Sequence, residues 1–478
     1  MSNVQTTLSA RGMERLLGDW RMRGASYRSL ADRIELLIVD GRISAYTRLP
    51  PERELADLLG HSRSTITTAY SALRDRGLVT SVRGSGSVVG LGAGRGPLQG
   101  PAITPVANLS HAVPEAWDGL LERTQRAVAR LPEIIHTHGL DFYGIPDLRS
   151  GLAERFSSLG ISTNPSQILV TLGAQHAIGL TARALLHRGD LVVLDVPSYP
   201  HAMDAFQDAG ARLFGLPMPD ERSSIQDWEH TLLSMRPSMA YVMPDFHNPT
   251  GSSLTNDERS RLAHAAARAG TILLIDETTS DLDIDRGGPR IPLAEYARQA
   301  GATAVTIGSA SKTIWHGLRV GWIRASSSII DHIASRRPAS DLGTPALEQL
   351  IVVETLPAMA EIIEDRRVHL RVSRDLVVER IAKRFPTWKV VTPDGGLCLW
   401  INLGHRSSSD LALAARAHGL SITAGPRFGV DGAFERHIRI PFASPAPQLL
   451  RAIDLLGTAW DGLALTPEFA PLDFTPTL

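Results

Sequence analysis

Lys312 is one of only three lysines in this chain of 478 residues, in which arginine supplies nearly all of the basic charge. It lies in the run Ser309-Ala310-Ser311-Lys312, seven residues before Arg319. An arginine guanidinium stays protonated at any relevant pH, whereas a lysine amine can lose its proton and attack a carbonyl. The retained lysine therefore indicates amine chemistry of the Schiff-base type.

Three polar residues that follow expected strands could surround this amine. Asp276 ends the apolar run 271–275, so its carboxylate would project at the carboxyl edge of a sheet and could hold a pyridine nitrogen protonated. Asn248 follows the strand that ends at Met243, and its amide could donate to a ring oxygen. Tyr199 follows another strand and could lie over the face of a flat ring.

Two segments could hold a phosphate group. The stretch 171–175 passes from a strand into a helix, so backbone N–H groups and the helix dipole converge there. The expected phosphate contacts are Gly173, Ala174, Gln175, Ser309, Ser311 and Arg319. Taken singly, Asp276 could cap a helix, Asn248 could belong to a turn and Tyr199 could be a core residue. Together they meet the requirements of pyridoxal 5'-phosphate.

The elements that must position these groups alternate along the chain. Apolar runs separated by helical patterns predict an α/β fold, with a large, mostly parallel sheet covered by helices on both faces. The strands are expected at 168–171, 191–195, 212–216, 240–243, 271–276, 304–308 and 320–323. A long helical stretch at 340–384 leads into a smaller α+β part, so we place the large part at about 140–338 and the small part at about 339–478.

The first ninety residues have a different pattern, with thirteen arginines, no lysine and nine acidic residues. After an amphipathic arm at 1–25, three helical patterns and a short hairpin predict a winged helix-turn-helix domain at 26–90. Ser62 should cap the third helix, which turns Ile66 and Tyr70 inward. The outward residues expected to face DNA on this helix include Arg63, Ser64 and Thr67.

The segment 49–77 and the hairpin tip Arg83-Gly-Ser-Gly86 closely resemble the GntR superfamily of regulators. This resemblance implies contacts with double-stranded DNA. The positions that it implies are Arg53, Arg63, Thr65, Arg83 and Gly84.

Residues 108–478 resemble the fold-type I aminotransferases that depend on pyridoxal phosphate, and the fusion of the two parts resembles the MocR group of GntR regulators. The resemblance implies that Arg439, in the run 437–442, binds the α-carboxylate of a substrate, a task that suits a bidentate guanidinium. Thr278 and Thr279 stand where relatives usually have a tyrosine bonded to the ring oxygen, so a shorter hydroxyl or a water must take that place. A homodimer is also expected.

Composition sets the remaining bounds. Residues 90–107 contain five glycines and three prolines, which predicts a linker that we place at 91–107. The single cysteine, Cys398, lies in an apolar run and is expected to be a buried structural thiol. One cysteine and no apolar stretch of membrane length favour a cytoplasmic protein that needs no membrane partner. We expect no metal site.

We interpret the chain as a DNA-binding transcription regulator that senses pyridoxal phosphate, or an amino compound, through an aldimine at Lys312. On this interpretation we expect no physiological turnover beyond residual transamination. The alternative is a working aminotransferase with an accessory DNA-binding head. A third reading is a DNA-binding dimer whose large domain is only a scaffold.

Overall fold

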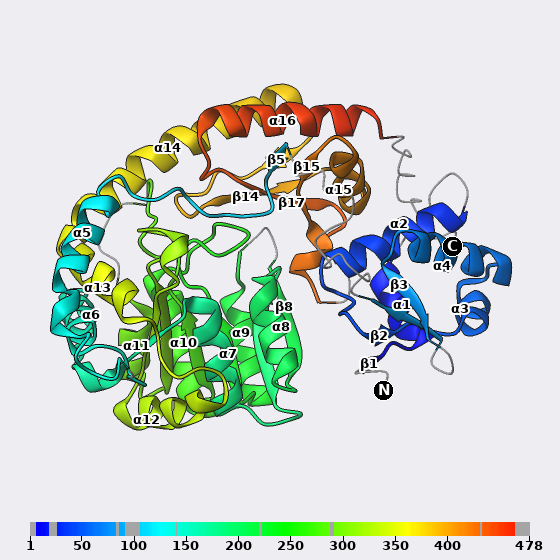
Figure 1. Ribbon diagram of the computed structural model, residues 1–478. Helices are drawn as coiled ribbons and strands as arrows, with labels where there is room; N and C mark the ends of the chain where they lie inside the picture. Colours follow the sequence, from blue (N-terminus) through cyan, green and yellow to red (C-terminus); the bar gives the residue numbers. More distant parts are fainter. Residues whose placement is uncertain are drawn as a thin grey trace, which may run out of the picture.

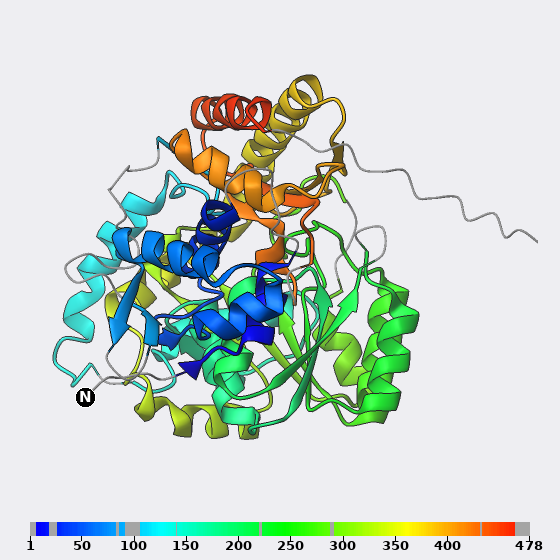
Figure 2. The same ribbon diagram turned by 90° about the vertical axis from the view of Figure 1, so that its right-hand side faces the viewer.

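The chain forms a small N-terminal head beside a larger body of two lobes (Figure 1). The computed structural model describes residues 6–18, 26–82, 86–90, 106–139, 141–218, 222–286, 291–430 and 433–463. Viewed from the head side, the head lies across the body where the two lobes meet (Figure 2). In the described part of the chain, no helix is both long and apolar enough to cross a membrane.

The head contains the predicted helices and hairpin. Its elements are β1 (Thr6–Thr7), α1 (Ala10–Leu17), α2 (Ser26–Val39), β2 (Thr47–Arg48), α3 (Glu52–Leu59), α4 (Arg63–Asp75), β3 (Val79–Val82) and β4 (Gly86–Val89). The strands form one sheet in the order β1-β2-β4-β3. Ser62 caps α4 as predicted, because its hydroxyl accepts the N–H of Thr65 at 3.1 Å. Met13 and Leu17 bury α1 of the arm in the core of the head.

The large lobe is built on a seven-stranded sheet in the order β6-β12-β11-β10-β9-β7-β8, in which β12 alone runs antiparallel to its neighbours. The strands are β6 (Ile168–Thr171), β7 (Leu191–Val196), β8 (Arg212–Pro217), β9 (Met239–Val242), β10 (Ile272–Asp276), β11 (Ala304–Ser309) and β12 (Gly321–Arg324). Each predicted strand is confirmed to within one residue at either end. Central strands are buried on both faces, which is why they read as apolar runs.

Helices cover both faces of this sheet. One face packs on α7 (Ala174–Leu185), α8 (Pro200–Asp208) and α12 (Ser327–Arg336). The other face packs on α5 (Leu120–Arg130), α6 (Pro146–Ser158), α9 (Ile225–Met235), α10 (Asn256–Ala269), α11 (Leu293–Ala300) and α13 (Ala346–Thr355). The predicted boundary at 338/339 is therefore too early, because α13 belongs to the core of the large lobe.

The small lobe has a four-stranded sheet in the order β13-β14-β17-β16. Its elements are β13 (Lys389–Val390), β14 (Cys398–Asn402), α15 (Ser408–Ala417), β16 (Thr423–Ala424), β17 (His437–Pro441) and α16 (Ala446–Asp461). The long helix α14 (Met359–Arg384) joins the lobes, since it enters the core of each. Separately, β5 (Ala107–Asn108) pairs with β15 (Leu420–Ser421), so ordered structure begins before the predicted end of the linker at 107.

Candidate functional site

Lys312 lies in the turn that follows β11, at the junction of the two lobes. Its Nζ donates a hydrogen bond of 2.6 Å to the carbonyl oxygen of Ala112. Burial lowers the pKa of the Lys312 amine to about 8, and the positive charges of Arg439 and Arg319 act in the same direction. A larger neutral fraction near neutral pH makes this amine a better nucleophile than an exposed lysine.

Asp276 ends β10 at the carboxyl edge of the sheet, and only 2% of its surface is exposed. One carboxylate oxygen accepts the hydroxyl of Tyr241 at 2.6 Å. The other accepts both the backbone N–H and the hydroxyl of Thr278, at 2.9 and 2.7 Å. Three donors thus fix the orientation of the acid.

These contacts change one expectation for this region and add a residue that the sequence did not single out. Thr278 was expected to substitute for a tyrosine at a ring oxygen, but its hydroxyl is engaged by Asp276 and orients the acid. Sequence reasoning missed Tyr241 altogether. Tyr241 lies opposite Leu274 in the neighbouring parallel strand. This register is a tertiary feature that cannot be read from the sequence.

Arg439 and Asn248 meet across the junction of the lobes. Arg439, on β17, donates from Nη1 to the amide oxygen of Asn248 at 3.3 Å and from Nη2 to the carbonyl oxygen of Ser110 at 2.5 Å. Its guanidinium lies 5.0 Å from the ring centroid of Phe428. The side chain is 7% exposed, and its Nε has no hydrogen-bond partner in the described structure. A buried guanidinium with a free N–H fits an anionic ligand.

The start of α7 has the properties of a phosphate cradle. No side chain caps this helix, so its first N–H groups remain available. Gly173 has φ +86°, and a Cβ there would lie 2.9 Å from Nη2 of Arg319. A Cβ at Gly321 would lie 2.6 Å from the carbonyl carbon of Gly173, so β12 packs directly on this turn. A side chain at either glycine would crowd the cradle.

Hydroxyl and guanidinium groups stand beside this turn. Ser309 donates to the hydroxyl of Ser311 at 2.9 Å, and Ser309 pairs with Gly321 in the sheet. Arg319 donates from Nη2 to the carbonyl oxygen of Leu172 at 3.1 Å. The predicted phosphate contacts therefore come together around the amino end of α7.

Tyr199 stands at the start of α8, where the side chain is partly buried. Burial raises the pKa of its hydroxyl to about 12, and the negative charge of Asp276 adds to this effect. Its ring meets His201 edge to face at a centroid distance of 5.5 Å. Its expected place over the face of a cofactor ring stays a prediction.

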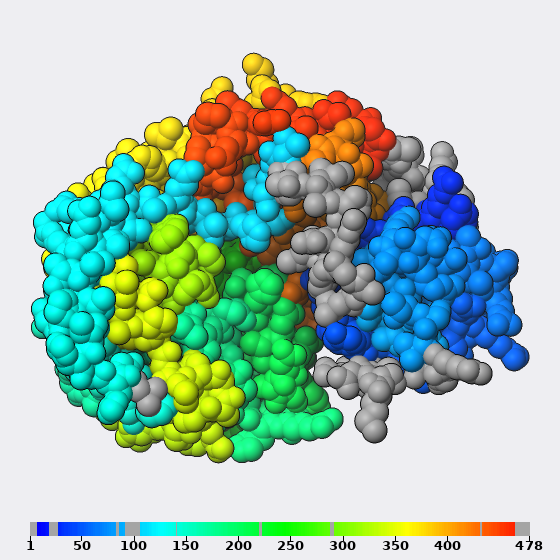
Figure 3. Space-filling model, viewed as in Figure 1, coloured from blue at the N-terminus to red at the C-terminus, as the bar shows by residue number. Residues whose placement is uncertain are grey.

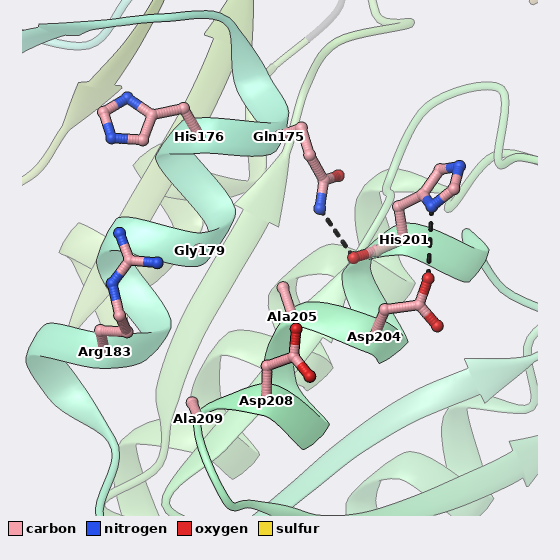
Figure 4. Close-up of a pocket in the computed structure, with 9 residues that line it drawn as sticks. All are labelled: Gln175, His176, Gly179, Arg183, His201, Asp204, Ala205, Asp208 and Ala209. Carbon is pink, nitrogen blue, oxygen red and sulfur yellow. Dashed lines mark hydrogen bonds and ion pairs between the residues drawn. The ribbon is translucent and has the colours of Figure 1, made fainter. Parts of the chain in front are cut away.

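A cavity of about 250 Å³ lies beside the cradle, between α7 and α8 (Figure 4). Gln175 turns its side chain toward this cavity and donates to the carbonyl oxygen of His201 at 2.8 Å. Its amide group is therefore directed away from the cradle, and only its backbone N–H remains for the predicted phosphate contact. The ring of His201 in turn contacts Asp204 at 3.2 Å.

The head exposes four of the seven residues expected to face DNA. Arg53 on α3 and Arg63, Ser64 and Thr67 on α4 are exposed, and the hydroxyl of Thr67 donates to Glu52 at 2.6 Å. Thr65 is partly buried, with its hydroxyl 2.8 Å from that of Ser62. The two predicted wing residues, Arg83 and Gly84, lie outside the described residues.

Comparisons with known proteins agree with this architecture. The model for aminotransferases of class I and II matches residues 120–456, and the model for bacterial regulatory proteins of the gntR family matches residues 26–89. The first match spans more than two thirds of the chain, so the chain belongs to the class I and II aminotransferase family. The second makes it a GntR-type regulator fused to that domain, and a domain of this kind implies DNA binding.

Individual relatives extend over both parts. The chain is 27% identical over 451 residues to the HTH-type transcriptional regulator YdfD of Bacillus subtilis, covering 87% of this chain and 92% of YdfD. It is 29% identical over 326 residues to 2-aminoadipate transaminase of Thermus thermophilus, covering 67% of this chain and 80% of that protein. The solved structure of LysN, an α-aminoadipate aminotransferase from Thermus thermophilus complexed with N-(5'-phosphopyridoxyl)-L-leucine, has a TM-score of 0.69 at 27% identity, covering 75% of this chain and 93% of LysN.

This family implies pyridoxal phosphate as the cofactor, and the residues present fit it. The uncapped start of α7 beside Arg319 suits a phosphate, and the fixed carboxylate of Asp276 suits a protonated ring nitrogen. Lys312 supplies a partly buried amine with a lowered pKa.

Proposed function

We propose that this chain is a DNA-binding regulator whose response is set at Lys312 by pyridoxal phosphate, by an amino compound, or by both. The observation that carries the proposal is the meeting of Lys312, Asp276 and Arg439 at the lobe junction of a chain that also has a GntR head. The regulator YdfD, which matches both parts, supports the same reading.

Each residue of the site has a definite task in this proposal. When bound, pyridoxal phosphate supplies an aldehyde that captures amines and a ring that withdraws electrons. Asp276, oriented by Tyr241 and Thr278, would accept a hydrogen bond from the ring nitrogen. The start of α7 would hold the phosphate. Arg439 would receive the carboxylate of an amino compound, because its Nε is free and its Nη groups already lie at the junction.

The partner of the head is double-stranded DNA, with α4 placed in the major groove. Arg63 and Ser64 lie at the exposed amino end of this helix, where helix-turn-helix proteins contact bases and phosphates. A homodimer would present two heads to paired half-sites. Operator binding by the purified protein in a mobility-shift assay, with sedimentation at the same concentration, tests both points.

We expect Arg63→Ala to weaken DNA binding. The slope of the logarithm of the DNA-binding constant against the logarithm of the salt concentration should become shallower by about the contribution of one phosphate contact. The cofactor spectrum of this variant should be unchanged, because the site lies in the body. Arg126→Ala, on the exposed face of α5, is the matched control and should bind DNA as the unmodified protein does. Equal DNA affinity of the Arg63 variant would remove α4 from the interface.

The cofactor half of the proposal is tested by absorbance. The purified protein incubated with pyridoxal phosphate should develop a visible band that borohydride bleaches, with the adduct mass on Lys312. Lys312→Ala should lose the band, and Lys383→Ala should keep it. A colourless unmodified protein without adduct would overturn the proposal.

A working aminotransferase is the second candidate, favoured by the position of Arg439 beside Asn248 and by the similarity to 2-aminoadipate transaminase. A single-turnover experiment with L-2-aminoadipate decides between the two. Formation of the oxo acid at about 1 s⁻¹ or above, with the cofactor left in its amine form, would establish the first half-reaction of transamination, and turnover would follow on addition of a second oxo acid as amino acceptor. Binding without oxo acid would leave the sensing role.

A further inference from the structure

A short segment that follows the linker crosses the site. Residues 109–116, here called the strap, run along the junction of the two lobes between β5 and Trp117, within the cyan segment of Figures 1 and 3. At its start, the N–H of Leu109 donates to the carbonyl of Ser421 at 2.8 Å. The hydroxyls of Ser110 and Ser421 lie 2.7 Å apart.

The far end of the strap is fixed on the large lobe. The N–H of Trp117 donates to the carbonyl of Ile314 at 3.0 Å, and its indole N–H donates to Asp365 at 2.9 Å. The strap therefore bridges the small lobe, where β5 is paired, and the large lobe, where Trp117 is held. Ser110 lies directly beside the small-lobe attachment, so displacement of its carbonyl would disturb that attachment.

Two backbone carbonyls in the first half of the strap occupy the two groups that the proposed function requires. Ala112 accepts from Nζ of Lys312 at 2.6 Å, and Ser110 accepts from Nη2 of Arg439 at 2.5 Å. One short segment thus engages both the amine and the carboxylate receptor.

A ligand at this site must compete with those carbonyls. A carboxylate is a stronger acceptor for a guanidinium than a neutral carbonyl oxygen, so it can take the Nη2 donor from Ser110. When Lys312 is covalently attached to the cofactor, its nitrogen carries fewer N–H groups that can donate to the carbonyl oxygen of Ala112. The attachment weakens one contact of the strap, and a carboxylate weakens the other.

We propose that the strap is an internal competitor at the ligand site, and that an amino compound bearing a carboxylate displaces Ser110 from Arg439. This inference rests on the proposed function and names the ligand chemistry and the moving part. The strap continues the chain directly from the linker sequence that leads to the head. Its displacement therefore gives ligand binding a route to the DNA-binding domain. A ligand without a carboxylate leaves the Ser110 contact in place.

A disulfide across the small-lobe attachment tests this. The hydroxyls of Ser110 and Ser421 are close enough that Ser110→Cys with Ser421→Cys should cross-link on oxidation. The two probes are N-(5'-phosphopyridoxyl)glycine, which has a carboxylate, and pyridoxamine 5'-phosphate, which has none. The controls are the reduced double variant and each single variant treated with oxidant.

Oxidation should weaken binding of the carboxylate probe at least about tenfold, as expected when a charge-assisted hydrogen bond is denied. Binding of pyridoxamine phosphate should change less than about twofold, and reduction should restore both affinities. Equal loss for the two probes, or no loss for either, would overturn the strap proposal. If neither probe binds even the reduced protein, the proposed function itself fails.

Hydrogen exchange of the unmodified protein gives an independent measurement that needs no cross-link. The carboxylate probe should speed exchange at the amide of Leu109, whereas pyridoxamine phosphate should not. Slower exchange of the strap with the carboxylate probe would contradict displacement.

Discussion

Lys312 belongs to the large lobe and Arg439 to the small lobe, so the charge of one acts on the other across the junction. The pKa of Lys312 is lowered to about 8 by burial, with Arg439 contributing in the same sense and Asp276 opposing it. Residues from separate elements of both lobes therefore set the reactivity of a single amine.

The pH dependence of cofactor uptake follows from this pKa. Because the neutral amine is the nucleophile, uptake of pyridoxal phosphate should rise as the pH increases through about 8 and then level off. Arg439→Met removes a neighbouring positive charge and should move the midpoint to higher pH. Stopped-flow absorbance measures the rate, and Lys389→Ala serves as the control. An unchanged midpoint in the Arg439 variant would show that the guanidinium does not act on the amine.

Tyr241 is a second test at this scale. Tyr241→Phe removes the hydroxyl that donates to Asp276 and leaves one buried oxygen without that donor. We expect the free energy of unfolding to fall by about 1–3 kcal/mol, measured by urea denaturation. The partly buried Tyr296 on α11 provides the control, since Tyr296→Phe should change stability by less than about 0.5 kcal/mol.

At the scale of elements, the packing of β12 on the start of α7 determines the shape of the cradle. A methyl group at Gly321 would meet the backbone of Gly173 and Ala174 at 2.6–2.8 Å, which neither segment can relieve by a side-chain rotation. Gly321→Ala should displace the start of α7 and weaken inorganic phosphate binding, measured by calorimetry. Gly179→Ala, in the same helix, meets only Nη1 of Arg183 at 3.6 Å and should leave phosphate binding unchanged. Equal phosphate affinities in the two variants would contradict the assignment of the start of α7 as the phosphate cradle.

Among the features of the structure, the sequence predicted the helices and strands best. Strands of the large sheet could be placed to within one residue because burial on both faces leaves continuous apolar runs. The end of the large lobe was misplaced because α13 carries the same kind of pattern whichever lobe it joins.

The sequence predicted only those site residues that a local sequence pattern identifies. Asp276 could be found because it ends an apolar run, and Lys312 because it is one of only three lysines and lies seven residues before Arg319. Tyr241 and the carbonyls of Ser110 and Ala112 could not, since their roles depend on strand register and on contacts between distant segments. A backbone carbonyl carries no side-chain signal at all.

At the scale of the whole molecule, the head is attached to the small lobe by a buried ion pair between Arg33 on α2 and Glu435. The two side chains are only 6% and 8% exposed. Glu435 also accepts the N–H and hydroxyl of Ser409, at 3.1 and 2.8 Å, and Leu36 of α2 joins the apolar core of that lobe. The head is thus held by both charge and apolar contact.

Arg33→Met should leave Glu435 buried without its cation. Breaking a buried pair in this way costs about 3–5 kcal/mol, so we expect the head to undock and unfold in a separate, earlier calorimetric transition. Arg126→Met, which breaks an exposed pair with Glu122, should shift stability by no more than about 1 kcal/mol. A single unshifted transition in the Arg33 variant would mean that the pair does not hold the head.

The 26-residue helix α14 restricts how the two lobes can move. At about 1.5 Å per residue it is a rod about 39 Å long, with one end embedded in each core. A continuous helix cannot lengthen without breaking its hydrogen bonds, so the lobes cannot simply pull apart. Bending of this rod, or rolling about its axis, is therefore the low-energy motion by which one lobe can move relative to the other.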